Sequence, residues 1–103
     1  MKYTQNERIL QITEKTLIVG IDVGSEKHYA RAFNFRGVEF GKLLIFENNA
    51  QGFVKLMEWA GKIANTSGFT DVTLGMEPTG HYWFNLAENT MKSGARIVLV
   101  NPH

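Results

Sequence analysis

Leu17–Ser25 reads LIVGIDVGS, a short apolar run with one carboxylate, Asp22, near its end. Its length and its β-branched residues predict a buried strand, and Gly24 with Ser25 predicts a turn directly after the acid. Asp22 would therefore lie at the edge of a sheet, where an ionised carboxylate needs a cation or several hydrogen-bond donors. We expect either a metal or phosphate role, or an Asx-turn in which Asp22 accepts from the Gly24 and Ser25 amides.

The composition predicts an ordinary globular domain. The 103 residues are 44% hydrophobic and 12% aromatic, enough for one modest core. A formal net charge of +1 favours no class of charged partner, and the absence of cysteine excludes disulfides and zinc–thiolate sites. Met1–Lys15 is polar without the apolar region of a signal peptide, and no apolar run has the length of a membrane helix. We expect a flexible leader at residues 1–15 and a cytoplasmic domain at residues 16–103.

The residues after the first strand predict an antiparallel meander. Large side chains alternate with Ala30 and Ala32 within His28–Phe35, which is the period of a strand. Asn34–Gly37 predicts a tight turn with a positive φ at its glycine, and Val38–Phe46 returns as a third strand. Short turns of this kind join antiparallel neighbours.

The period of the apolar residues then changes to that of a helix. A single stripe is formed by Phe53, Leu56, Met57, Ala60, Ile63 and Ala64. Asn48 is predicted to cap this helix and Gly68 to end it. Asp71–Glu77 follows as a fourth strand that ends on a second acid. A second helix, capped by Thr79 and ended by Gly94, leads to a fifth strand at Arg96–Asn101.

The order of elements is therefore β β β α β α β, and connection rules give an α/β topology. Three consecutive strands pair as a meander, and each crossover helix makes the next strand parallel. We expect a mixed five-stranded sheet in the order 3-2-1-4-5, with the second strand antiparallel and the helices packed on the sheet. Asp22 lies five residues after Leu17, and Glu77 lies five residues after Val72. If the first and fourth strands start level, both acids reach the carboxyl end of the sheet together.

Two carboxylates in that position would share one site. Adjacent strands are about 4.8 Å apart, and ligands of open α/β sheets bind at the carboxyl end. Carboxylates so close repel one another unless a divalent cation or a proton lies between them. Oxygen ligands alone suit Mg²⁺ or Mn²⁺. The spacing therefore predicts a metal site built on Asp22 and Glu77.

Two motifs in this order of elements carry a resemblance to a known family. They are IDVGS at residues 21–25 and GMEPTGHY at residues 75–82, and the chain closes on VNP at residues 100–102. With these motifs, Thr16–His103 resembles the N-terminal part of the DEDD transposases, insertion-sequence recombinases of the pilin-inverting group with a RuvC-like, RNase H-type fold. The resemblance implies that Asp22 and Glu77 are the first two of four carboxylates that hold Mg²⁺ for DNA strand cleavage and transfer.

The family carries its last two Asp on a later helix and a Ser nucleophile in a C-terminal domain, and neither has a counterpart in this sequence. We therefore expect the C-terminal helices of the fold to be missing. We also expect the chain alone to bind Mg²⁺ weakly and to leave DNA uncleaved. The resemblance implies DNA as a partner, and a structured guide RNA by analogy with other members of the group.

Five further residues are candidate nucleic-acid contacts, each with a plainer alternative: Lys27, Arg31, Thr79, Gly80 and Tyr82. The two cations lie on or near the first hairpin, where solubilising charges explain them equally well. Thr79 and Gly80 begin the second predicted helix, whose N-terminus could face a phosphate, although capping is the more general role. Tyr82 could stack on a base, but an aromatic residue at the start of a helix is more often part of the core.

Two other classes of function stay open. IDVGS followed by a hairpin also resembles the first phosphate loop of sugar kinases, chaperones and actin-type ATPases, in which the Gly24 and Ser25 amides would hold phosphate. A carboxylate at Glu77 has no purpose in that class. A non-catalytic assembly domain is the other alternative. His28 and His81 could contact a metal or a phosphate, but a solvated turn histidine is the more usual explanation of both.

The resemblance also leads us to expect a homodimer. Without a later helix to cover it, one face of the sheet would expose an apolar stripe that is unusual for a monomer. Arg96–Asn101 is expected at a sheet edge, with unpaired backbone groups. We expect the interface to leave the cleft of Asp22 and Glu77 free.

Overall fold

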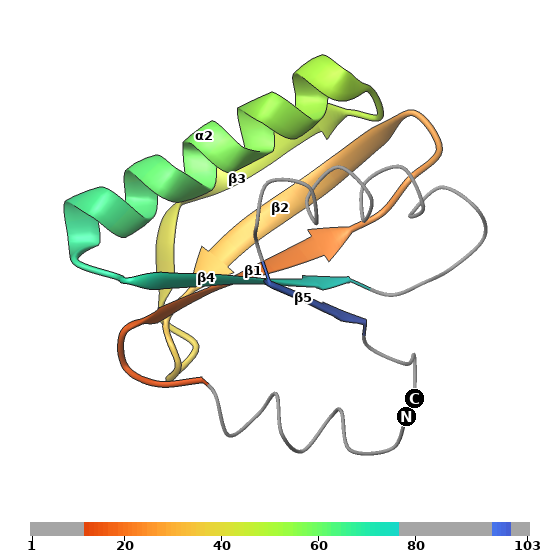
Figure 1. Ribbon diagram of the computed structural model, residues 1–103. Coiled ribbons are helices and arrows are strands. Elements are labelled where there is room, and N and C mark those ends of the chain that lie inside the picture. Colours follow the sequence, from red (N-terminus) through yellow and green to blue (C-terminus); the bar gives the residue numbers. More distant parts are fainter. Residues whose placement is uncertain (1–11, 77–95, 100–103) are drawn as a thin grey trace.

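The computed structural model describes residues 12–76 and the backbone of residues 96–99. Its strands are β1 (Thr16–Asp22), β2 (Lys27–Phe33), β3 (Glu39–Glu47), β4 (Asp71–Met76) and β5 (Arg96–Leu99), and its helix is α2 (Ala50–Ser67). The strands form one sheet in the order β3-β2-β1-β4-β5, and α2 lies along one face of it (Figure 1). The predicted mixed α/β class is therefore confirmed. The predicted second helix and its Thr79 cap lie outside the described residues.

The register of the central strands decides which side chains meet. β1 pairs antiparallel with β2, and the last pair is Asp22 with Tyr29. β1 pairs parallel with β4, with Leu17 opposite Val72 and Ile21 opposite Met76. The two strands therefore start level, which is the condition that the spacing argument for the two acids requires. Asp22 and Glu77 each follow the last of these pairs in sequence, but Glu77 lies outside the described residues.

The core lies between α2 and the facing side of the sheet. Alternate residues of β1 point into it, and Leu17 and Val19 are fully buried there. In β2 the same face carries Ala30 and Ala32, both fully buried, whereas Tyr29 is 41% exposed on the other face. The core is completed by Ile21, Phe46, Phe53, Leu56, Ala60, Ala64, Leu74 and Met76. Burial of these side chains is the main force that holds the helix on the sheet.

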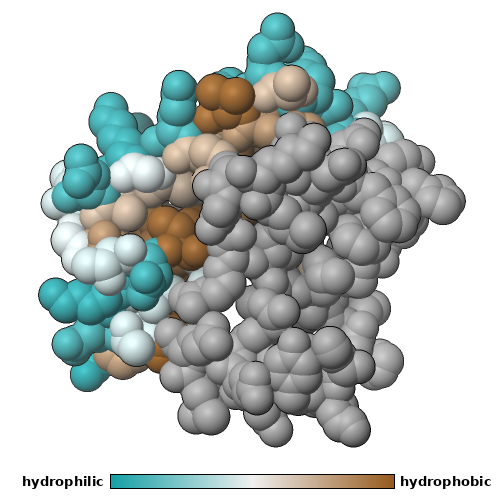
Figure 2. Space-filling view, in the orientation of Figure 1, coloured by the Kyte–Doolittle hydropathy of each residue, from teal (hydrophilic) through white to brown (hydrophobic). Residues whose placement is uncertain are grey.

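The outward side of α2 is mostly polar. Figure 2 shows hydrophilic residues along the described surface in this view, with hydrophobic ones among them. Val54 is one such apolar residue of α2, at 56% exposed. Within residues 12–76 and 96–99, no helix is long and apolar enough to cross a membrane.

The ends of α2 are fixed by local hydrogen bonds, and one of them corrects the sequence prediction. Asn49, not Asn48, is the N-cap: its Oδ1 accepts from the Gly52 amide at 2.8 Å. Such a cap stabilises a helix by about 1 kcal/mol. At the other end Gly68 has a φ of 82° and its amide donates to the Ala64 carbonyl. The predicted glycine end is therefore confirmed.

The strands of the β2–β3 hairpin end closer to the centre of the sheet than the sequence predicts, so the connecting loop is longer. The Asn34 Oδ1 accepts from the Arg36 amide at 2.9 Å and from the Val38 amide at 3.0 Å, so the turn begins at Asn34. β2 therefore ends at Phe33 rather than at Phe35. Gly37 has a φ of 85°, as the turn prediction requires.

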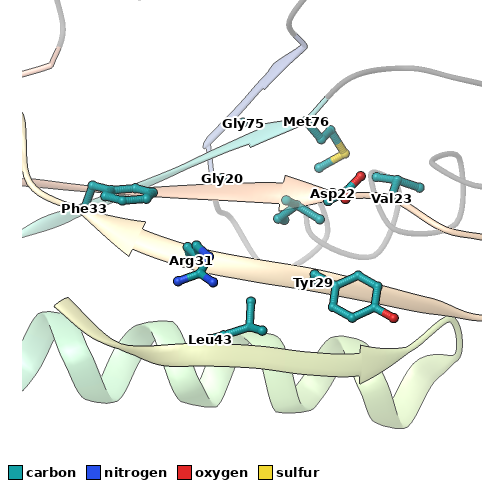
Figure 3. A pocket seen from close by; sticks show the side chains of 10 residues that line it. Gly20, Asp22, Val23, Tyr29, Arg31, Phe33, Leu43, Gly75 and Met76 are labelled. Carbon is teal, nitrogen blue, oxygen red and sulfur yellow. The ribbon is translucent and has the colours of Figure 1, made fainter. Parts of the chain in front are cut away.

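β3 is irregular opposite the middle of β2. Ala30 pairs with Leu44 and Ala32 with Phe40, so residues 41–43 stand opposite Arg31 alone. Gly41 lies in this bulge with a φ of 75°, and a Cβ built on it would come within 2.8 Å of Ile63 in α2. Such an irregularity bends an edge strand, and Leu43 lies beside Arg31 on the face away from the helix (Figure 3).

Candidate functional site

Asp22 is the last residue of β1, at the carboxyl end of a central strand. It is exposed and lies on the face of the sheet opposite α2, because Leu17, Val19 and Ile21 of the same strand are the residues buried against the helix. Within the described part of the chain, no hydrogen-bond donor or cation is bonded to its carboxylate. A free carboxylate at the carboxyl edge of an α/β sheet is well placed to bind a ligand.

A groove of about 640 Å³ runs from Asp22 across this face of the sheet. Figure 3 shows Asp22 and Met76 at one end, Arg31 in the middle and Phe33 at the other end. Its floor includes Gly20 and Gly75, which pair with each other across β1 and β4. A Cβ built on Gly20 would meet no atom of the described residues within 4 Å, so among these residues the floor is open at this glycine.

Arg31 is the one cation among the predicted nucleic-acid contacts that the structure places in this groove. Its Nη1 lies 2.8 Å from Glu39 Oε2, and the two side chains are 53% and 36% exposed. An exposed pair of this kind contributes about 0–1 kcal/mol, so Glu39 is easily exchanged for a competing anion. Lys27 is exposed at the start of β2 but does not line the groove. The candidates Glu77, Thr79, Gly80 and Tyr82 lie outside the described residues.

The turn after Asp22 is not an Asx-turn, which was one of the two alternatives left open by the sequence. The Gly24 amide donates to His28 Nδ1 at 3.1 Å instead of to the Asp22 carboxylate. Gly24 is also packed closely, because a Cβ there would overlap the Lys27 carbonyl oxygen. One of the two amides that a phosphate loop would need is therefore already committed to a side chain.

His28 is fully buried, which corrects the expectation of a solvated turn histidine. Its ring centroid lies 5.1 Å from that of Phe46 and 6.4 Å from that of Phe53. Nδ1 accepts from the Gly24 amide, so the proton is on Nε2, which donates to Asn48 Oδ1 at 3.2 Å. Burial lowers the pKa of His28, and the bond to Asn48 opposes that shift only in part. Both ring nitrogens are engaged, so His28 is not a metal ligand here.

We expect the domain to lose stability as the pH is lowered from 6.5 toward the lower pKa of His28 in the folded chain. In the unfolded chain His28 takes up a proton near its ordinary pKa of 6.5, whereas burial holds the pKa lower in the folded chain. Between those two values the unfolded chain binds more protons, so the free energy of unfolding falls with pH by at most about 1.4 kcal/mol per pH unit. Urea denaturation on both sides of pH 6.5 measures this slope. A His28→Gln variant with an equally steep slope would show that another group causes it.

Of the two residues of the predicted metal site, only Asp22 lies among the described residues. Among residues 12–76, no three His, Asp or Glu side chains lie close enough together to hold a metal ion. Asp22 itself fits such a role, because a free, exposed carboxylate is a suitable ligand for a hard divalent cation. One carboxylate is not a complete site, so the fit depends on further oxygen ligands such as Glu77.

The fold and the groove define a mixed α/β domain with a free carboxylate at the carboxyl end of its first strand. The family model of the IS110-type DEDD transposases, described as Transposase, matches residues 19–103, so the chain belongs to that transposase family. The predicted family is thereby confirmed. Comparison with curated proteins gave no match.

Proposed function

We propose that this chain is the N-terminal catalytic portion of a DNA transposase with an RNase H-like (RuvC-like) sheet. Asp22 and Glu77 supply the first two carboxylates of its Mg²⁺ or Mn²⁺ site. The observation that carries the proposal is the exposed Asp22 carboxylate, free of partners in the described residues, at the carboxyl end of β1. The parallel register supports Glu77 as its neighbour, since Met76, the residue before it, pairs with Ile21.

The chemistry of strand cleavage explains why these groups are needed. A bound divalent cation neutralises charge on the scissile phosphate and stabilises the attacking or leaving oxygen. Asp22 and Glu77 hold and orient that cation. Arg31, in the same groove, binds a neighbouring phosphate after releasing Glu39, and Lys27 adds positive charge at the start of β2. Thr79, Gly80 and Tyr82 are proposed as further contacts to DNA.

We also propose two other partners, a structured guide RNA and a second copy of this chain. The guide RNA is proposed from the family resemblance alone. The homodimer would use apolar surface outside the groove, such as Ile45 of β3, which is 45% exposed and does not line the groove of Asp22. Light scattering over a dilution series tests it, and a monomer at high concentration would contradict it.

The phosphate-loop alternative is less well supported. It needs the Gly24 and Ser25 amides for phosphate, whereas the Gly24 amide donates to His28. It also gives no purpose to a second carboxylate at Glu77. The assembly-only alternative predicts no divalent cation at Asp22, so one binding experiment separates it from the proposal.

Paramagnetic Mn²⁺ provides that experiment. In NMR spectra of the chain, we expect Mn²⁺ to broaden the amide signals around Asp22 first, with a dissociation constant of about 1 mM because the site is incomplete. Asp22→Asn should abolish the effect. Asp71→Asn is the matched control, because Asp71 is an exposed acid at the opposite end of the neighbouring strand β4. Broadening that survives Asp22→Asn, or that centres on Asp71, would contradict the proposal.

A further inference from the structure

The turn that follows Asp22 is not held by the hairpin to which it belongs. Pairing of β1 with β2 ends at Asp22 and Tyr29. The first two residues of β2 pair with the other neighbour instead: Lys27 with Glu47, and His28 with Phe46. Residues 23–26 therefore leave the β1–β2 ladder directly after the proposed metal ligand, and something else must fix their position.

Three hydrogen bonds, one to His28 and two to Asn48, hold this turn. His28 Nδ1 accepts from the Gly24 amide at 3.1 Å. Asn48 Nδ2 donates to the Ser25 carbonyl at 3.2 Å, and the Asn48 amide donates to the Glu26 carbonyl at 3.0 Å. The bond between His28 Nε2 and Asn48 Oδ1 joins the two residues to each other. Three consecutive residues of the turn are thus tied to one connected pair.

This pair is anchored in the rigid part of the domain. His28 is fully buried against Phe46 and Phe53, so its ring cannot turn without disturbing the core. Asn48 lies between the end of β3 and Asn49, the N-cap of α2. The position of the turn is therefore set by the packing of the helix on the sheet and not by the sequence of the turn alone.

We propose that His28 and Asn48 are positioning residues of the Asp22 site: they fix the turn at residues 23–26 so that the Asp22 carboxylate is oriented before a cation binds. This inference rests on the proposed function. Gly24 is two residues from Asp22, and the intervening Val23 lines the groove, so movement of the turn changes both the carboxylate and the groove. A ligand that is oriented in advance binds its metal more tightly, because less freedom is lost on binding.

The two ring nitrogens can be tested separately. The side chain of Asn places an oxygen near the position of His Nδ1, whereas that of Gln places an amide nitrogen near the position of His Nε2. His28→Asn can therefore still accept from the Gly24 amide, and His28→Gln can still donate to Asn48 but leaves that amide unpaired. Each variant removes the buried ring and one of its two hydrogen bonds. A purely structural role of His28 therefore predicts that both variants change Mn²⁺ binding to a similar extent.

The readouts are Mn²⁺ binding at Asp22 and hydrogen exchange of the Gly24 amide, measured by NMR on the folded chain. We expect His28→Gln to lose protection of that amide and to weaken Mn²⁺ binding about tenfold. His28→Asn should keep both close to wild type. Leu56→Ala is the control for stability, because Leu56 is fully buried in α2 and makes none of the turn's hydrogen bonds. It should lower the melting temperature without changing Mn²⁺ binding to the folded chain.

Two results would overturn the inference. In one, His28→Gln leaves Gly24 exchange and Mn²⁺ binding unchanged. In the other, all three variants weaken binding in proportion to their loss of stability, which is what a merely structural role predicts. Absence of Mn²⁺ broadening at Asp22 in the wild-type chain is a different failure, because it would overturn the proposed function and with it the metal-binding part of this inference.

Discussion

Replacing Gly52 with alanine is expected to lower the free energy of unfolding by roughly 2–4 kcal/mol, a large part of the stability of a small domain. Gly52 is buried near the start of α2, and a Cβ built on it would overlap the Glu47 carbonyl oxygen. It would also lie 2.8 Å from the carbonyl carbon and the amide nitrogen of Glu47. These are backbone atoms at the end of β3, so no change of rotamer relieves the overlap.

The start of α2 must therefore move away from β3 in this variant. The movement weakens the bond from the Gly52 amide to the Asn49 cap and the burial of the neighbouring Phe53. Helix propensity acts in the opposite direction, because alanine in a helix is favoured over glycine by about 0.5–1 kcal/mol. The steric term is larger than this gain, so the net effect is a loss of stability.

Gly61 provides a matched control in the same helix. A Cβ built on Gly61 would meet no atom of residues 12–76 within 4 Å, so Gly61→Ala should show the favourable helix propensity alone. Urea and thermal denaturation of both variants measure the difference, and we expect Gly52→Ala to melt at least about 10 °C below wild type. Equal stability of the two variants would mean that α2 can move off β3 without loss.

The arrangement of the central strands could be predicted because two independent rules agree on it. The crossover rule makes β4 parallel to β1, and the apolar runs of both strands begin at comparable points, Leu17 and Val72. The structure pairs these two residues. The alternation of Val72, Leu74 and Met76 with polar or small residues also gave the correct faces of β4, since Leu74 and Met76 are buried.

The surroundings of Asp22 could not be predicted in the same way, because they depend on contacts between distant residues. Asn48 and Asn49 are equally good caps by residue type, but Asn48 is bonded to His28 and Ser25, about twenty residues away. A signal for the burial of His28 was present. His28 lies on the same face of β2 as Ala30 and Ala32, since every second residue of a strand points the same way. This face packs against the helix, whereas Tyr29 on the other face is exposed.

If Asp22 holds the cation as proposed, replacing it with asparagine is expected to reduce metal-dependent DNA strand cleavage by the active transposase about a thousandfold. Loss of a carboxylate that holds the cation removes several kcal/mol of transition-state stabilisation, and each 1.4 kcal/mol is about tenfold in rate. Asparagine keeps the shape of the side chain. Because no described residue is bonded to the carboxylate, the free energy of unfolding should change by no more than about 0.5 kcal/mol.

The combination of unchanged stability and lost cleavage is what distinguishes a metal ligand from a structural acid. Asp71→Asn again serves as the control, since it removes an exposed acid from the start of β4, away from the groove. Strand cleavage measured on labelled DNA over a range of Mg²⁺ and Mn²⁺ concentrations should be lost with Asp22→Asn and retained with Asp71→Asn. Full cleavage by Asp22→Asn at ordinary Mg²⁺ concentrations would remove Asp22 from the catalytic site, and the free carboxylate at the end of β1 would then need another explanation.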